Sequence, residues 1–237
     1  MMNKIIVLSG AGISAESGIK TFRDSNGLWE NHSVEEVATP QGFSANPTLV
    51  YRFYNQRRAQ LLEGKVKPNA AHFALSEFES YYPRHTHIIT QNVDNLHEQA
   101  GSKNVLHMHG ELLKAKCVTT NRSFSVDFNF DEHIPCPCCD KKGSLRPDIV
   151  WFGEVPYYME EIEALIEQAD VFISVGTSGS VYPAAGFVQL ANAVGAHTIE
   201  VNISPSETKN AFAEHRYGLA SEVLPKLLNE LRSAEPI

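Results

Sequence analysis

This sequence has no long apolar run and no excess of basic residues. Its four cysteines do not form the pattern of a disulfide framework. No apolar stretch in its 237 residues reaches about 18, and the run after Lys4 is too short for a membrane span or a signal peptide. Its 20 basic and 28 acidic residues give a net charge of −8, which disfavours broad binding to nucleic acid or anionic membranes. We therefore expect a cytoplasmic protein with no nucleic-acid or membrane partner.

Helical and strand patterns alternate along the chain, as in α/β proteins with a parallel sheet. The composition, with 43% hydrophobic and 20% charged residues, is that of a globular protein. Buried strands are expected at Lys4–Ser9, Thr86–Thr90, Val105–His109, Val171–Gly176 and Thr198–Asn202. Helices are expected at Pro47–Leu62, Asn69–Ser80, Glu160–Gln168, Ala184–Val194 and Val223–Leu231.

A glycine-rich loop follows the first strand. Gly10, Gly12 and Ala15 match the G-x-G-x-x-G/A fingerprint of dinucleotide-binding turns. Small residues there let backbone N–H groups approach a pyrophosphate at a helix N-terminus, and the alternative is a tight turn that simply needs glycine. An ordinary Rossmann protein also has a second strand ending in an acidic residue about 20 positions on. The segment 21–32 has no strand pattern, and Glu30 within it lies in the wrong context, which disfavours a hydride-transferring dehydrogenase.

Polar side chains follow the strand expected at Thr86–Thr90. Gln91, Asn92 and Asp94 come where open α/β sheets place their ligand contacts. Their side chains are suited to bonding an amide, a ribose or an ordered water. Asn95 is better explained as the cap of the next helix.

Two histidines close the next expected strand. His107 and His109 share one face of a strand by alternation. His109, beside Gly110, is placed to reach a cleft and to act as a general base near neutral pH. The alternative is a purely structural histidine.

The four cysteines indicate a metal site. Cys117 precedes Cys136 by 19 residues, and Cys138 and Cys139 follow directly. Two C-x-x-C pairs about 15–20 residues apart are typical of tetrahedral zinc sites. The first pair is broken here, because Thr120 occupies its second position. We expect one structural zinc ion held by all four cysteines, and the alternative is a degenerate pair with weak or no metal.

Two segments do not fit the alternation and are interpreted as insertions. Residues 24–67 show no strand pattern, and residues 112–147 hold every cysteine and weak β alternation. We predict an α/β fold with a Rossmann-like parallel sheet, helices on both faces, and a smaller inserted zinc-ribbon and helical domain. Within one core over 1–237, the large domain would span about 1–24, 68–111 and 148–237, and the small one about 25–67 (helical) and 112–147 (zinc-binding).

In their order along the chain, these motifs resemble one family, the sirtuins, which are NAD-dependent protein deacylases. The resemblance is carried by Gly10–Ser14 with Gly18–Arg23, Thr90–Asp94, His109-Gly110, Leu145-Arg146-Pro147 with Val150–Glu154, Gly176-Thr177-Ser178 and Val201-Asn202. It runs from Ile5 to about Ala220, and the ordered set is far more specific than any one motif. Two positions depart from the family pattern: Thr120, and Lys20 where proline is common.

The resemblance implies a role for each segment. The amides of Ala11–Ser14 would hold the NAD pyrophosphate under a loop carrying Phe22 and Arg23. Asn92, counted as catalytic, and Asp94 would position the nicotinamide amide and the nearby ribose. The full set of implied NAD contacts is Gly10, Ala11, Gly12, Ile13, Ser14, Phe22, Arg23, Gln91, Asn92, Val93, Asp94, Gly176, Thr177, Ser178, Asn202, Ile203, Ser204 and Ala220.

The resemblance also implies the course of the reaction. The acyl-lysine carbonyl oxygen would attack the ribose C1′ as nicotinamide leaves. His109 would be the general base that activates a ribose hydroxyl, which attacks the resulting imidate. The family's products are nicotinamide, O-acyl-ADP-ribose and the free lysine. Val150–Gly153, with Trp151 and Phe152, would be a strand edge that pairs with the extended substrate peptide.

The helix expected at Pro47–Leu62 carries Tyr54 and Arg57 three residues apart on one face. Val50 and Leu61 lie on the same stripe, so this face turns toward protein. A guanidinium buried there needs a carboxylate or phosphate partner. Its planar fork suits a carboxylate, and a tyrosine hydroxyl adds a donor.

The pattern Tyr54-x-x-Arg57 resembles the signature of class III sirtuins, which accept succinyl- and malonyl-lysine. Glu154 and the Ala15-Glu16-Ser17 variant of the first motif resemble that class as well. The resemblance implies that the tyrosine and the arginine read the acidic acyl group. The alternative is that Arg57 and Arg58 form a solvated surface pair of little energetic value.

We therefore expect a monomeric enzyme that removes succinyl, malonyl or acetyl groups from lysines of extended peptide segments. An ADP-ribosyltransferase would use the same NAD activation with another acceptor, but the retained Val150–Gly153 segment favours deacylation. A non-catalytic NAD-binding module is a third alternative. His109, Asn92 and Asp94 are all present, which argues against it.

Overall fold

The computed structural model describes residues 4–20, 28–29 and 32–233. Three residues named above, Phe22, Arg23 and Glu30, lie outside these ranges. No helix in the described ranges is long and apolar enough to cross a membrane.

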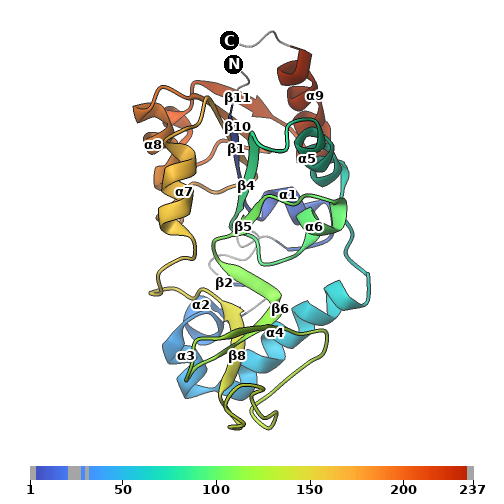
Figure 1. Ribbon diagram of the computed structural model, residues 1–237, viewed down its shortest axis with the longest axis vertical. Coiled ribbons are helices and arrows are strands. Elements are labelled where there is room, and N and C mark those ends of the chain that lie inside the picture. The colour runs from blue at the N-terminus through green and yellow to red at the C-terminus, as the bar shows by residue number, and fades with distance from the viewer. Residues whose placement is uncertain (1–3, 21–27, 30–31, 234–237) are drawn as a thin grey trace.

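A six-stranded parallel sheet forms the upper part of the molecule in Figure 1. The strands, in their order across the sheet, are β11 (Glu214–Tyr217), β10 (His197–Asn202), β9 (Val171–Val175), β1 (Ile5–Ser9), β4 (Thr86–Thr90) and β5 (Val105–His107). All five predicted strands are present within two residues at either end. The edge strand β11 was not predicted, because its sequence EHRY is only half-buried and has no apolar run.

Helices cover both faces of this sheet, as the sequence predicted (Figure 1). They are α5 (Ala70–Tyr81) and α9 (Ala220–Ser233) on one face, and α7 (Met159–Ile166) and α8 (Phe187–Ala193) on the other. The central strand β1 contributes side chains to the hydrophobic cores on both faces of the sheet. Ile5 and Val7 pack with α5 and α9. Ile6 and Leu8 pack with α7 and α8. Burial on both sides explains why β1 is a continuous apolar run.

The lower part of Figure 1 combines two segments that are distant in sequence. They contribute α2 (Val34–Val37), α3 (Pro40–Ala45) and α4 (Pro47–Leu62), and the antiparallel strands β7 (Ser123–Ser125), β6 (Gly110–Cys117) and β8 (Leu145–Ile149). The Tyr51 hydroxyl on α4 joins the segments by donating to the Leu145 carbonyl over 2.5 Å. The expectation that 24–67 lacks strands was wrong in detail, because β2 (Leu28–Trp29) pairs with β3 (His32–Ser33). The exact boundaries of the two domains stay a prediction.

The helix α4 has the bounds that were predicted from the sequence. Asn46 caps the helix by accepting from the Leu49 N–H over 3.1 Å, and Pro47 occupies the first turn. Gly64, just past the end, adopts a φ of +65°, which glycine tolerates best. Two short helices, α1 (Gly12–Ala15) and α6 (Leu96–Ala100), complete the elements around the site.

Candidate active site

The loops after β1 and β9 pack directly against each other. The Gly10 N–H donates to the Val175 carbonyl and the Gly12 N–H to the Gly176 carbonyl, each over 2.9 Å. A Cβ atom on Gly12 would lie 2.6 Å from the Gly176 Cα. Glycine is therefore required at position 12 by loop packing alone, whatever the loop binds.

Asn92 and Asp94 tie the β4 loop to this glycine loop. The Asn92 Nδ2 donates to the Gly10 carbonyl over 3.1 Å and to the Ser14 Oγ over 3.2 Å. The Ser14 hydroxyl in turn donates to the Asp94 carboxylate over 3.1 Å. Both β4-loop side chains are buried, and burial raises the pKa of Asp94. The structure thus brings the two predicted polar motifs into one hydrogen-bonded cluster.

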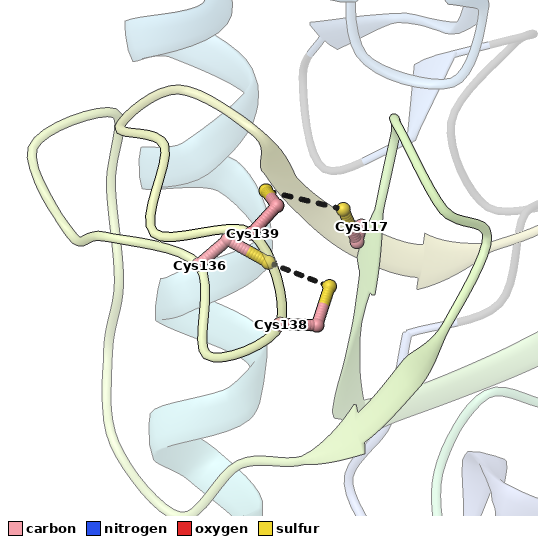
Figure 2. Close-up of side chains that lie close together, drawn as sticks. All are labelled: Cys117, Cys136, Cys138 and Cys139. Atoms are coloured by element: carbon pink, nitrogen blue, oxygen red, sulfur yellow. Dashed lines mark hydrogen bonds between the residues drawn. The ribbon is translucent and has the colours of Figure 1, made fainter.

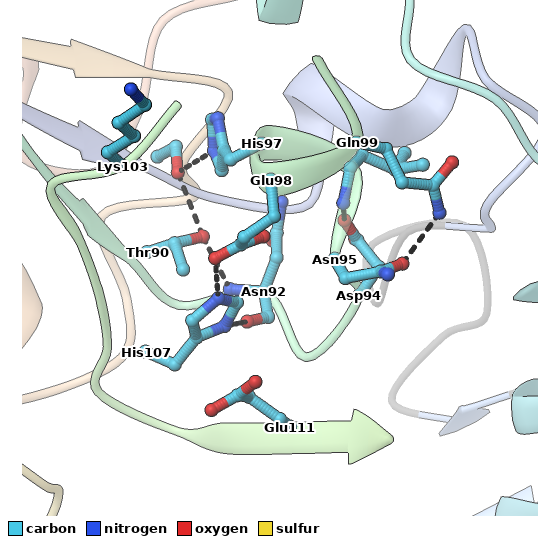
Figure 3. Close-up of polar contacts among 12 residues, drawn as sticks. Thr90, Asn92, Asp94, Asn95, His97, Glu98, Gln99, Lys103, His107 and Glu111 are labelled. Carbon is cyan, nitrogen blue, oxygen red and sulfur yellow. Dashed lines mark hydrogen bonds and ion pairs between the residues drawn. The ribbon is translucent and has the colours of Figure 1, made fainter. Parts of the chain in front are cut away.

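The cap of α6 differs from the prediction. Asp94, not Asn95, accepts the Leu96 N–H, over 3.1 Å. The side-chain oxygen Oδ1 of Asn95 instead accepts from the Gln99 side-chain amide over 2.7 Å, as Figure 3 shows. A carboxylate one position earlier reaches the same helix end, and sequence alone did not separate the two.

His109 is placed as a neutral base. Its Nδ1 lies 3.1 Å from the Gln91 carbonyl oxygen. A carbonyl only accepts, so Nδ1 carries the proton and the Nε2 lone pair is left to accept one. Burial lowers the pKa of His109, although the bond to Gln91 partly offsets this. The imidazole is therefore unprotonated at neutral pH, as a general base requires.

The loops after β9 and β10 meet beside the glycine loop. The Asn202 side-chain amide donates to the Thr177 carbonyl over 2.7 Å, and its oxygen accepts from the Ile203 N–H over 3.0 Å. The Ser178 and Ser180 hydroxyls are 2.7 Å apart. Two further residues in this region, Ile203 and Ala220, were expected to contact NAD. Ile203 is 69% exposed, and Ala220 is buried at the start of α9.

Tyr54 lies at the buried face of α4. Its hydroxyl oxygen accepts a hydrogen bond from the Trp151 indole N–H over 2.9 Å, and both side chains are almost fully buried. Arg57 is half-buried, its guanidinium carbon 3.3 Å from the Phe53 ring centre and its Nη1 2.6 Å from the Phe53 carbonyl. The predicted pair therefore shares one helix face.

Arg58 overturns the alternative of a solvated arginine pair. Its side chain is fully buried, its Nε donates to the Leu112 carbonyl over 2.8 Å, and Nη1 bonds Asn55. Its guanidinium also lies 4.5 Å from the Phe130 ring centre. Burial lowers the pKa of Arg58 to about 10. Helical periodicity did not indicate this, because 57 and 58 point in different directions.

The segment Val150–Gly153 is not a strand, contrary to the expectation of a strand edge. The strand β8 ends at Ile149, and the Val150 N–H donates to the His109 carbonyl over 2.9 Å. The Phe152 N–H donates to the Ala38 carbonyl, also over 2.9 Å. A turn follows, with Gly153 at a φ of +89°. Backbone hydrogen bonds to two other segments therefore take the place of a regular ladder between strands.

A charged pair fixes this segment and was missed by the sequence analysis. Arg146 donates to both oxygens of Glu154, over 2.6 and 2.8 Å. Its guanidinium carbon lies 3.5 Å from the Trp151 ring centre, a cation–π contact. Glu154 also accepts the Trp151 N–H over 2.9 Å. The sequence did offer a signal for this pair, because Arg146 and Glu154 are oppositely charged motif residues eight positions apart.

The four cysteines converge beyond the end of β6 (Figure 2). Their sulfur atoms lie within 4.8 Å of one another. Cys117 and Cys139 are 3.8 Å apart, and Cys136 and Cys138 are 3.4 Å apart. Four sulfurs at about 2.3 Å from one tetrahedral zinc would be separated by about 3.8 Å. The donor set and its geometry fit a structural zinc ion.

Thr120, which breaks the first cysteine pair, remains next to the cluster. Its hydroxyl lies 3.1 Å from the Cys138 sulfur. Hydrogen bonds from Thr120 lower the pKa of the Cys117 thiol to about 5, which favours the thiolate that a metal requires. Cys138 supplies the fourth sulfur that position 120 lacks.

Replacing Cys139 with serine is expected to remove the zinc. Elemental analysis should fall from about one zinc per chain to nearly none, because a structural site needs all four ligands. Since metal binding contributes directly to folding, Tm should fall by roughly 10 °C. Thr120→Ala is the control and should keep its zinc. Full zinc content in the Cys139 variant would contradict the assignment.

Comparison with known proteins agrees with this geometry. A model of the Sir2 family matches residues 10–183. A protein of Pasteurella multocida (strain Pm70), named NAD-dependent protein deacylase, is 57% identical over 95% of this chain and 96% of its own length. A protein of the same name from Vibrio cholerae serotype O1 is 53% identical over 98% of this chain and 94% of its own length.

Solved structures agree as well. One described as a crystal structure of a Sir2 homolog–NAD complex superposes with a TM-score of 0.87 at 37% identity, covering 97% of this chain and 89% of that one. Sir2Af2 bound to a myristoylated histone peptide superposes with a TM-score of 0.74 at 33% identity, covering 97% and 91%. The family model spans well over half of the chain. This chain belongs to the Sir2 family.

Proposed function

We propose that this chain is an NAD-dependent protein deacylase that removes succinyl, malonyl and acetyl groups from lysine side chains. The observation that carries the proposal is the placement of His109 at the end of the sheet that also holds Asn92 and the glycine loop. A base with an available Nε2 thus lies at the same end of the sheet as the glycine loop. The relatives from P. multocida and V. cholerae are named NAD-dependent protein deacylases, which supports the deacylase activity and leaves the acyl group open.

In the proposed reaction, NAD is a substrate and is consumed. The acyl oxygen of the lysine amide forms a bond to C1′ of the nicotinamide ribose, and the bond from C1′ to nicotinamide breaks. Asn92 and Asp94 hold the nicotinamide end in place for that step. His109 then takes a proton from a ribose hydroxyl, whose oxygen attacks the imidate carbon. The bond from that carbon to the lysine nitrogen then breaks, and the amine leaves with a proton. Water adds to the same carbon as its bond to the C1′ oxygen breaks, which gives O-acyl-ADP-ribose.

The acidic acyl groups are proposed to bind at Tyr54 and Arg57. The Tyr54 hydroxyl, which accepts from the Trp151 indole N–H, lies three residues before Arg57 on α4. A half-buried guanidinium gains most from a carboxylate partner, because charge-assisted bonds strengthen away from water. A carboxylate at the end of an acyl chain suits this pair, because a tyrosine hydroxyl and a guanidinium both donate hydrogen bonds.

The peptide is proposed to bind in extended form along Val150–Gly153. The N–H groups of Val150 and Phe152 already have partners. Peptide N–H groups would therefore donate to the carbonyl oxygens of this segment, in the manner of an added strand. We propose further that the enzyme works as a cytoplasmic monomer without nucleic-acid or membrane partners.

The test is a steady-state assay of one peptide carrying acetyl-, then succinyl-lysine, with NAD. We expect nicotinamide release that depends on the acyl group, and higher kcat/KM for succinyl-lysine. Mass spectrometry should find the free lysine and O-acyl-ADP-ribose. Peptide that instead gains ADP-ribose would indicate the transferase, and no nicotinamide release on either peptide would contradict the proposal.

A further inference from the structure

His107 contacts the backbone carbonyl of Asn92 and has no role in the site as described above. It is 5% exposed at the end of β5, with its Nδ1 3.2 Å from the Asn92 carbonyl oxygen. Its Nε2 lies 2.7 Å from the Glu98 carboxylate on α6. Figure 3 shows the ring between these two partners, so that one imidazole joins α6 to the β4 loop.

The two partners determine the protonation of this ring. A carbonyl oxygen and an ionised carboxylate accept hydrogen bonds and do not donate. Both ring nitrogens must therefore carry protons for both contacts to be hydrogen bonds, which makes His107 an imidazolium. His109, two residues on, contacts one acceptor within the described part of the chain, the Gln91 carbonyl, and is neutral. Neighbouring histidines thus hold opposite protonation states.

We propose that His107, kept cationic by Glu98, is a positioning residue that fixes Asn92 and through it the nicotinamide end of the site. This inference rests on the proposed function, in which Asn92 orients the nicotinamide ribose.

Asn92 makes hydrogen bonds through both its side chain and its backbone. Its N–H donates to the Thr90 hydroxyl over 3.1 Å, and its side-chain amide donates to the glycine loop and to Ser14. The His107 bond is the one that reaches its carbonyl from the β5 side. Losing that bond removes the contact that holds the Asn92 carbonyl from the β5 side, while the other three bonds remain. A displacement of about 1 Å at a reacting centre can cost about 100-fold in rate.

The charges around His107 favour its cationic form. Burial alone would lower its pKa, but the hydrogen bond and charge of Glu98, with the charge of Glu111, raise it above the ordinary value. Other titratable groups face the same region from the packed elements. They are Asp94 before α6, His97 on α6, Lys114 and Lys116 on β6, Asp148 on β8, and Tyr157 and Tyr158 before α7.

The sign of the pH dependence follows from these states. The positioning contacts are complete below the ordinary histidine pKa and are lost as pH rises through the raised pKa of His107. Activity should therefore fall on the alkaline side as this ring loses a proton. The acid side is set separately by His109, whose lowered pKa keeps it an available base at neutral pH.

The deciding variant is Glu98→Gln, which keeps an acceptor oxygen but removes the charge at a partly exposed position. We expect the alkaline limb of the kcat profile to move down by about one pH unit, with the acid limb unchanged. His107→Phe should lower kcat about 10- to 100-fold, with the KM for the acyl peptide within about twofold.

The matched control is His197→Asn, at a second histidine–glutamate pair. The His197 Nε2 lies 3.0 Å from Glu214 on the far edge of the sheet, and its loss should leave kcat and both limbs unchanged. An unshifted alkaline limb in Glu98→Gln, with wild-type kcat, would overturn the inference even if His107→Phe fails to fold. A wild-type enzyme that releases no nicotinamide would instead overturn the proposed function first.

Discussion

Replacing His109 with alanine is expected to lower kcat for deacylation by about 10²- to 10⁴-fold, the usual contribution of a general base. The Nδ1 bond to the Gln91 carbonyl leaves Nε2 as the accepting nitrogen, and no methyl group can substitute for it. The proton is taken after nicotinamide has left, so the variant should still release about one nicotinamide per site in a single turnover. Steady-state and rapid-quench assays measure the two quantities.

The matched control for this prediction is His133→Ala, at an exposed histidine. It should retain wild-type kcat. If the His109 variant kept wild-type kcat, or lost nicotinamide release to the same degree as deacylation, the base would have to be placed elsewhere or earlier in the reaction.

Replacing Arg57 with methionine is expected to lower kcat/KM for succinyl-lysine about 10- to 100-fold and for acetyl-lysine less than about threefold. A hydrogen bond to a charged group contributes about 1.5–3 kcal/mol, and only the acidic acyl group supplies the charge. Methionine keeps much of the volume and apolar surface of the arginine stem. The ratio of the two kcat/KM values, measured on one peptide, is the readout.

Two further arginines on α4 provide the comparison. Arg52→Met, at an exposed position, should leave kcat/KM unchanged for both substrates. Arg58→Met should lower Tm instead, because it removes a buried guanidinium that bonds the Leu112 carbonyl. Equal losses on both acyl groups in Arg57→Met would contradict a carboxylate-binding role.

The sequence predicted most reliably where a local signal has one physical meaning. The proline in the first turn of α4 and the glycine just past its end gave both helix ends correctly, because each acts on the backbone within a few residues. The apolar run of β1 similarly required a strand buried on both faces. Four cysteines near the spacing of a zinc site correctly indicated a sulfur cluster, even with Thr120 in place of the expected ligand.

The sequence predicted poorly where a distant partner supplies the stabilisation. Edge strand β11 is polar and becomes a strand only by pairing with β10. Val150–Gly153 has the residues of a strand, yet its N–H groups bond His109 and Ala38 instead. No local pattern contains such partners.

The sequence by itself therefore determined the α/β class, the family and the motifs from which the site is built. Only the tertiary structure decided the state of each group within it. Histidines at 107 and 109 have the same chemistry in the sequence. Among the described residues, however, the first contacts a carboxylate and a carbonyl, while the second contacts only a carbonyl. One is held as a cation and the other as a base, because protonation depends on the partners that the fold provides and not on the residue type.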